Sequence, residues 1–198
     1  MGIQDLTEKE YVTLIFTYGT LKRGFSNHIL MQELMRTGDA AFKGTYLTVE
    51  KYPLVCGPYR VPFLLNMPGS GNRIMGELYA VSAQGLARLD ELEGTTRGHY
   101  ERLPILILPA ENEDGDFGID GEILSGCSGE TLSRGGVTCA EAYYAHRSYE
   151  KEMWRRNEGK GFVTYSEKEA KGYVKRKDRP QNLTFLDHIR IFVSSPSD

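Results

Sequence analysis

Several features that mark common classes of protein are absent from this chain of 198 residues. Its formal net charge is only -3 at pH 7, so no basic excess is present to attract nucleic acid or an anionic membrane. No segment approaches the roughly 18 consecutive apolar residues of a membrane-spanning helix, and the first ten residues lack the apolar core of a signal peptide. We therefore expect a cytoplasmic protein that binds neither nucleic acid nor membrane.

Cysteine is scarce as well. Cys56, Cys127 and Cys139 are the three cysteines, and they are too few and too scattered for a disulfide framework, a zinc site or a CxxC redox motif. The four histidines share no metal-ligand spacing with one another or with the cysteines. We expect reduced thiols and neither a metal nor a cofactor. A nucleophile elbow of the Gly-x-Ser-x-Gly type is also missing.

A turn at residues 18–24, with the sequence YGTLKRG, is the most informative feature that is present. It follows an apolar, β-prone run and precedes a helical pattern, so its backbone N–H groups are free to bind an anion. Gly19 and Gly24 have the spacing of a phosphate-binding loop, but Phe25 stands where that motif requires lysine. The acidic stretch between Glu111 and Glu122 likewise fits no calcium-binding register. The turn therefore predicts anion binding without nucleotide hydrolysis.

The hydrophobic pattern, with many strands and only two clear helices, predicts an α+β fold or a small barrel rather than a doubly wound sheet. We expect residues 1–10 to be disordered, residues 11–158 to form one domain with an acidic loop insertion at 110–136, and residues 159–198 to be a C-terminal extension that docks in part. Basic residues at 175–179 are read as a solvated face, with a localisation signal or a contact for an acidic partner as the alternatives. Predicted strands span 12–17, 41–49, 73–81, 99–108 and 137–146; predicted helices span 27–35, 83–93 and 149–155; and residues 67–72 are read as a hairpin connection.

The predicted caps are Ser26 for the first helix and Ser82 for the second, which Gly94 should end. In that second helix, three leucines define an apolar arc. At about 100° per residue, Glu93 falls about 40° from the centre of the arc, Asp90 about 100° and Glu91 about 160°. Of these acids, only Glu93 should face the core, unless the helix frays first and leaves it in water. Burial would raise the pKa of Glu93 and suit it to acid–base work near neutral pH. Glu77 is placed either toward solvent or toward the same cavity.

Several separated motifs occur together in one order: the turn at 18–24, NH at 27–28, YPLV at 52–55, VPFLL at 61–65, PGSG at 68–71, GELYAV at 76–81, LDELE at 89–93 and YER at 100–102. In this order they resemble the γ-glutamylcyclotransferase-like family, closest to its γ-glutamylamine cyclotransferase and plant AIG2-like branches. The likeness is dense over residues 12–108 and looser near 140–146. The acidic insertion and the segment after Arg155 depart from the animal amine cyclotransferase pattern.

The resemblance implies a small mixed β-barrel with flanking helices within the α+β class. It also implies that Tyr18, Gly19, Thr20 and Leu21 hold a γ-glutamyl group and that Glu93 is the catalytic acid–base. A γ-glutamyl amide carries its own nucleophile, because its α-amine can attack the side-chain carbonyl, and this accounts for the missing serine or cysteine. We expect a metal-independent cyclotransferase acting on small γ-glutamylamines such as γ-glutamyl-ε-lysine. A preference for γ-glutamyl-amino acids or glutathione, and a catalytically silent binding protein on the same scaffold, remain alternatives. The sequence indicates no particular protein partner.

Overall fold

The computed structural model describes residues 11–110 and 136–195. The predicted disorder of residues 1–10 and almost all of the predicted acidic insertion therefore concern residues outside the described part. Within the two described ranges, no helix combines the length and the apolar character needed to cross a membrane.

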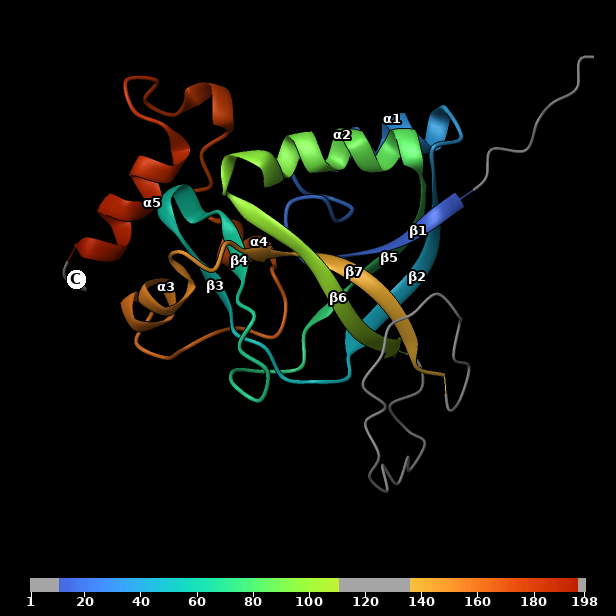
Figure 1. The fold of residues 1–198 in the computed structure, drawn as a ribbon, viewed down its shortest axis with the longest axis horizontal. Coiled ribbons are helices and arrows are strands. Elements are labelled where there is room, and N and C mark those ends of the chain that lie inside the picture. Colours follow the sequence, from blue (N-terminus) through green and yellow to red (C-terminus); the bar gives the residue numbers. More distant parts are fainter. Residues whose placement is uncertain (1–10, 111–135, 196–198) are drawn as a thin grey trace, which may run out of the picture.

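A seven-stranded mixed sheet is the centre of the described fold (Figure 1). The strand order is β1-β5-β2-β6-β7-β4-β3, with an additional pairing between β1 and β7. The strands are β1 (Tyr11–Thr17), β2 (Ala40–Thr48), β3 (Leu54–Cys56), β4 (Pro62–Leu64), β5 (Met75–Ser82), β6 (Tyr100–Pro109) and β7 (Thr138–Ala145).

The sheet curls because β1, at one end of the strand order, also pairs with β7. Antiparallel pairing joins β1 to β5, β5 to β2, β2 to β6 and β6 to β7, and a parallel contact between Ile15 and Glu141 returns from β7 to β1. The hairpin of β3 and β4 attaches to β7 through Leu64 and Tyr144. The expected α+β class is confirmed, and the sheet approaches the expected barrel without closing into a regular one.

Helices cover the sheet in two groups. The first group is α1 (His28–Arg36) and α2 (Ala83–Glu93), which lie side by side over the sheet and are joined by an ion pair between Glu33 and Arg88 (Figure 1). The second group gathers near β3 and β4, where α5 packs against α3 and η1 (Figure 1). Its elements are η1 (Pro58–Arg60), α3 (Glu150–Arg156), α4 (Glu167–Ala170), η4 (Arg176–Asp178) and α5 (Phe185–Ser194); a further short turn, η2 (Thr95–Arg97), follows α2.

Two apolar clusters form the core, one on each face of the strands. Neighbouring residues alternate between them: Ile15 and Tyr79 belong to the cluster under α1 and α2, whereas Phe16 and Leu78 belong to the other. This alternation is the period of two that a strand imposes on its side chains. Both faces of β1 and β5 are therefore buried, which holds the chain leaving β1 in a defined position.

The ends of α2 match the prediction from sequence. Ser82 is the N-cap, and its Oγ accepts a hydrogen bond from Gly85 N at 3.1 Å. Gly94 ends the helix in the left-handed conformation, with φ of 65°, where glycine has no steric penalty. Because α2 continues through Glu93, the alternative in which the helix frays before that residue is wrong.

Three other sequence predictions are wrong. Asn27, not Ser26, is the N-cap of α1, and the buried Ser26 Oγ has no hydrogen-bond partner in the described part of the chain. Residues 67–72 do not close a hairpin, because β4 and β5 are not paired; Asn72 instead exchanges backbone hydrogen bonds with Tyr52 at 2.8 and 3.0 Å. Cys56 is a buried free thiol as expected, but Cys139 is disulfide-bonded.

Candidate active site

The turn at residues 18–24 leaves the end of β1 and leads into α1. It is compact, because Lys22 N donates to Gly19 O at 3.1 Å and Asn27 N donates to Thr20 O at 3.0 Å. A Cβ at Gly19 would lie 2.6 Å from Pro62 Cγ, so only glycine lets the turn approach β4 this closely. The backbone N–H groups of Gly19, Thr20 and Leu21 donate no hydrogen bond to any described residue.

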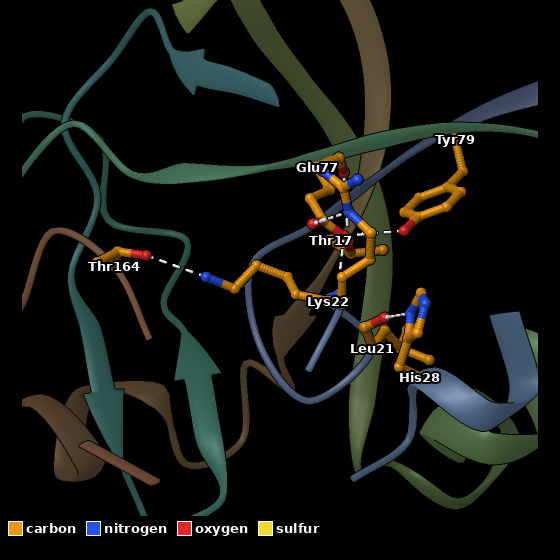
Figure 2. A network of polar contacts seen from close by, with 8 residues as sticks. Thr17, Leu21, Lys22, His28, Glu77, Tyr79 and Thr164 are labelled. Carbon is orange, nitrogen blue, oxygen red and sulfur yellow. Dashed lines mark hydrogen bonds and ion pairs between the residues drawn. The ribbon is translucent and has the colours of Figure 1, made fainter. Parts of the chain in front are cut away.

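Glu77 of β5 holds the far side of the turn. Its carboxylate accepts hydrogen bonds from Arg23 N at 3.1 Å, from Arg23 Nε at 2.9 Å and from the Tyr79 hydroxyl at 2.8 Å. Its backbone oxygen accepts from Thr17 Oγ1 at 3.2 Å, and Figure 2 shows Thr17 and Tyr79 on either side of it. Glu77 thus points neither to solvent nor into the cavity, the two positions expected from the sequence. Its carboxylate oxygens instead accept the hydrogen bonds that position the turn.

Two further contacts fix the turn from other directions (Figure 2). His28 Nδ1 donates to Leu21 O at 2.9 Å, which orients the backbone of the turn from the start of α1. Lys22 Nζ donates to Thr164 Oγ1 at 3.0 Å, and partial burial lowers the pKa of Lys22, with Glu77 opposing that change. The turn is therefore held on three sides, and its free N–H groups are preorganised.

Glu93 is the last residue of α2 and is partly buried. Its carboxylate makes no hydrogen bond or ion pair with any residue that the structure describes. Burial raises the pKa of Glu93 from 4.5 to about 7, and the positive charge of Arg176 opposes this rise. A carboxyl group with this pKa exchanges protons readily at neutral pH.

Asp90 contacts the sheet, although the helical arc predicts that only Glu93 faces it. Its carboxylate accepts from the Tyr143 hydroxyl at 2.7 Å and from Arg102 Nε at 3.0 Å, and Arg102 also pairs with Glu141. These partners lie on β6 and β7. Because Arg102 and Tyr143 have long side chains, they reach Asp90 even though it lies at the edge of the apolar arc of α2. Asp90 is thus bound in an ion-pair network, whereas Glu93 has no partner in the described ranges.

One cavity brings the predicted residues together. Tyr18, Gly19, Thr20, Leu21 and Glu93 all line it, although the turn and the acid are more than 70 residues apart in sequence. The other lining residues are Phe16, Thr17, Pro62, Tyr100 and Tyr143. The cavity is therefore lined both by residues whose backbone N–H groups have no partner in the described ranges and by a partly buried carboxylate that has none there either.

The tyrosines of the cavity are fixed and neutral. Tyr18 donates its hydroxyl hydrogen to the backbone oxygen of Tyr143, and Tyr100 donates to Pro62 O at 3.0 Å. Burial raises the pKa of both phenols well above their usual value, and the nearby charge of Glu93 adds to the effect. These groups shape the cavity, and Glu93 is the lining group whose pKa lies near 7.

Sequence reasoning missed four residues around this cavity. Tyr100 and Tyr143 belong to strands. The hydrophobic pattern of these strands predicts that the rings are buried, but not which groups the hydroxyls contact. Arg176 and Arg179 were read as a solvated face; Arg176 is exposed, but Arg179 is partly buried, and both line a second cavity that shares Glu93 with the first. Only the docking of the C-terminal segment reveals this. Among the described residues, no group of three or more histidine, cysteine, aspartate or glutamate side chains is arranged to hold a metal ion.

Known proteins are similar to this chain in sequence and in fold. Residues 15–119 match the family model described as γ-glutamyl cyclotransferase, AIG2-like. An Arabidopsis thaliana protein, whose name gives γ-glutamylcyclotransferase as its expected activity, is 62% identical over 199 residues, which is 100% of both chains. A γ-glutamylaminecyclotransferase from Mus musculus is 44% identical over 106 residues, which is 52% of this chain and 70% of that one.

Solved structures extend the comparison to the fold. The crystal structure of an AIG2-like protein from Mus musculus superposes with a TM-score of 0.57 and 27% sequence identity. The superposition covers 88% of this chain and 100% of the mouse chain.

Proposed function

The chain belongs to the AIG2-like γ-glutamyl cyclotransferase family, an enzyme family, and from this premise we propose that it converts γ-glutamylamines into 5-oxoproline and a free amine. The favoured substrate is γ-glutamyl-ε-lysine or a similar small γ-glutamylamine. The observation that supports this proposal best is the meeting of an unpaired carboxylate, Glu93, with the unpaired N–H groups of residues 19–21 around one cavity.

The reaction needs no nucleophile from the protein. The α-amine of the substrate attacks its own γ-carbonyl carbon, the new C–N bond closes a five-membered ring, and the original amide C–N bond breaks. Holding the substrate folded for this attack is worth about 7–11 kcal/mol in well-oriented intramolecular reactions. A cavity with fixed, buried walls is suited to that task.

Glu93 moves the proton in this scheme. As a carboxylate it takes a proton from the substrate ammonium, which frees the amine for attack, and it then gives that proton to the departing nitrogen. The ring nitrogen loses a second proton after the new C–N bond has formed, and this proton ends on the released amine, which leaves as an ammonium ion. Both transfers require a group whose pKa lies near the working pH, because it must accept and release protons with similar ease. Burial raises the pKa of Glu93 to about 7, which meets this requirement.

The N–H groups of Gly19, Thr20 and Leu21 supply fixed positive dipoles. They suit the α-carboxylate of the γ-glutamyl group and equally the oxyanion that develops on the attacked carbonyl, since both are anions. Their orientation does not depend on the substrate, because Glu77, His28 and Lys22 already hold the turn.

The decisive experiment compares Glu93→Gln with Glu91→Gln. Glu91 is the matched control, because it lies in the same helix but its side chain is exposed. Glutamine keeps the shape of Glu93 and removes the base, so we expect the release of 5-oxoproline from γ-glutamyl-ε-lysine to fall by about 10²–10⁴-fold, with little change in Glu91→Gln. Near wild-type activity in Glu93→Gln would contradict the mechanism.

A panel of wild-type assays tests the substrate class. γ-Glutamyl-ε-lysine, γ-glutamyl-alanine and glutathione separate a γ-glutamylamine preference from a preference for γ-glutamyl-amino acids or peptides. Turnover of none of them, together with a stoichiometric protein partner in a pull-down, would favour the binding-protein alternative instead.

A further inference from the structure

A second cavity adjoins the first. The two cavities share Thr20, Glu93 and Tyr100. Half of the other lining residues of the second cavity come from the C-terminal segment, which contributes Tyr173, Arg176, Arg179 and Phe185. A substrate whose γ-glutamyl half occupies the first cavity would extend its leaving amine into the second.

Arg179 is held rigidly in this wall. Its guanidinium lies 5.4 Å from the ring centre of Tyr59, 5.7 Å from Tyr173 and 5.1 Å from Phe185. Its Nε donates to Val174 O at 3.0 Å, and its Nη2 donates to the Tyr173 hydroxyl at 3.3 Å. Since a guanidinium has five N–H donors, three of them donate to no described residue.

Neither arginine has an acidic partner among the residues that the structure describes. No ion pair joins Arg176 or Arg179 to a carboxylate in the described ranges, although Arg176 donates weakly to Leu92 O at 3.4 Å. Burial lowers the pKa of Arg179, because the charged guanidinium is less well solvated among the aromatic rings than in water. A buried charge of this kind is stabilised by an anion, and the planar fork of arginine matches a carboxylate.

The charges that line the second cavity favour an anionic guest. Two arginines, one acid, Glu93, and one histidine, His99, line it together with two tyrosines. Burial lowers the pKa of His99 to about 4, with Arg97 and Arg176 adding to the effect, so this imidazole is neutral at pH 7. The charged side chains that line the cavity therefore carry a positive excess.

The C-terminal segment is packed firmly enough to present a site. Phe185 stacks on Phe63 with ring centres 6.3 Å apart, and Val174 N donates to Tyr59 O at 3.2 Å. The Tyr59 hydroxyl is 2.9 Å from His188 Nδ1 of α5. This segment lies outside residues 15–119, the part that matches the family model.

We propose that Arg176 and Arg179 form a subsite for a carboxylate on the amine half of the substrate. The preferred substrates are then γ-glutamyl amides of amines that carry a carboxylate, such as the lysine half of γ-glutamyl-ε-lysine, rather than γ-glutamyl amides of simple amines. This inference rests on the proposed function, because it assigns the leaving amine to the second cavity. Arg179 is the fixed partner, and Arg176 closes the rim.

The test uses two compounds that differ by one carboxylate. γ-Glutamyl-ε-lysine is compared with the γ-glutamyl amide of 1,5-diaminopentane, which is the same molecule without the lysine carboxylate. For the wild type we expect kcat/KM to favour the first compound by about tenfold to a hundredfold, the range of a charge-assisted hydrogen bond. Equal kcat/KM values would overturn the subsite.

Variants locate the effect. The comparison is made at about pH 9, where Glu93 is ionised with or without Arg176. There, Arg179→Gln and Arg176→Gln should each lose most of the preference by lowering kcat/KM for γ-glutamyl-ε-lysine alone, while Arg36→Gln, at an exposed position in the last turn of α1, should keep it. Arg176 is exposed, so its variant should fold even where Arg179→Gln loosens the segment. An equal loss for both compounds would overturn the proposal, because the arginines would then act on the γ-glutamyl half or on folding.

Binding separates this inference from the proposed chemistry. The Glu93→Gln protein can be titrated with the same two compounds by calorimetry, which needs no turnover. Tighter binding of the carboxylated compound supports the subsite even if the wild type releases no 5-oxoproline, a result that would count only against the cyclotransferase activity. Equal affinities, or no binding of either compound, would overturn the subsite.

Discussion

The carboxylate of Glu77 is bound to Arg23 twice, through the backbone nitrogen at 3.1 Å and through Nε at 2.9 Å. The first contact fixes the direction of the backbone, and the second neutralises the acid, whose side chain is only 11% exposed. A strand residue of β5 thereby determines where the turn after β1 presents its free N–H groups. Glu77 is a positioning residue for the candidate site, which it does not itself line.

Removing Glu77 should therefore reduce activity without touching the cavity. We expect Glu77→Ala to lower kcat/KM for γ-glutamyl-ε-lysine by about tenfold to a hundredfold, because a displacement of about 1 Å of binding groups costs this much in oriented reactions. Glu77→Gln should recover part of the loss, since its amide oxygen still accepts a hydrogen bond. Steady-state kinetics with a circular dichroism check for folding would measure both.

Glu33→Ala is the matched control for that substitution. Glu33 also pairs with an arginine, Arg88, at 2.8 Å, but both side chains are about half exposed. Such surface pairs contribute about 0–1 kcal/mol, so kcat/KM should stay near the wild-type value. A similar loss in both variants would contradict a special role for Glu77.

The pH profile should reflect the raised pKa of Glu93. Below about pH 7 the carboxyl is mostly protonated and cannot take the substrate proton, so kcat/KM should rise as the pH increases through about 7. Kinetics between pH 5 and 9 would give the midpoint. A profile that is already flat from pH 5 upward would show that the pKa of the essential carboxyl is not raised.

Arg176 should shift that midpoint. Its positive charge lowers the pKa of Glu93 against the larger effect of burial, so Arg176→Gln should move the rise of kcat/KM to higher pH. The shift is read most cleanly with the γ-glutamyl amide of 1,5-diaminopentane, which has no carboxylate for the arginine to bind. Arg36→Gln should leave the midpoint unchanged, and an unchanged midpoint in both variants would mean that Arg176 does not act on Glu93.

Glu93 should also make stability depend on pH. Its pKa is raised on folding from 4.5 to about 7, so between these values the folded state binds the extra proton and stability falls as the pH rises. Glu93→Gln lacks this loss. We expect the variant to gain about 1–3 kcal/mol relative to wild type at pH 8 compared with pH 4.5, in urea unfolding at both pH values. The same difference at both pH values would count against the shift.

Gly19 should not tolerate a side chain. In Gly19→Ala, the new Cβ would meet Pro62 Cγ at 2.6 Å, so the turn or β4 must move. We expect a loss of about 1–3 kcal/mol in stability and a lower kcat/KM, because the moved N–H groups line the cavity. Thermal unfolding and kinetics on the same preparation would report both.

Gly69→Ala separates strain from function. Gly69 has a φ of +87° and open space around its Cβ position, and it does not line the candidate cavity. Alanine there should cost about 1–2 kcal/mol through the left-handed backbone and leave kcat/KM unchanged. If Gly19→Ala behaved in the same way, the close approach of the turn to Pro62 would have no catalytic consequence.

Local features of this protein could be predicted from the sequence because their causes lie within a few residues. The bounds of α2 follow from Ser82, Gly94 and the leucine spacing, and the same periodicity turns Glu93 toward the core. The prediction failed for Ser26 and for residues 67–72, where chain neighbours fit a local pattern but distant partners decided the outcome.

The sequence by itself thus determined the α+β class, the turn at 18–24 and the orientation of Glu93. Only the tertiary structure decided that the turn and Glu93 meet in one cavity, that Glu77 clamps the turn, and that Arg176 and Arg179 line a second cavity. The physical reason is the range of the interactions. Caps and periodicity act over a few residues, whereas these contacts join segments more than 50 residues apart, and their geometry exists only once the sheet and the C-terminal segment have packed.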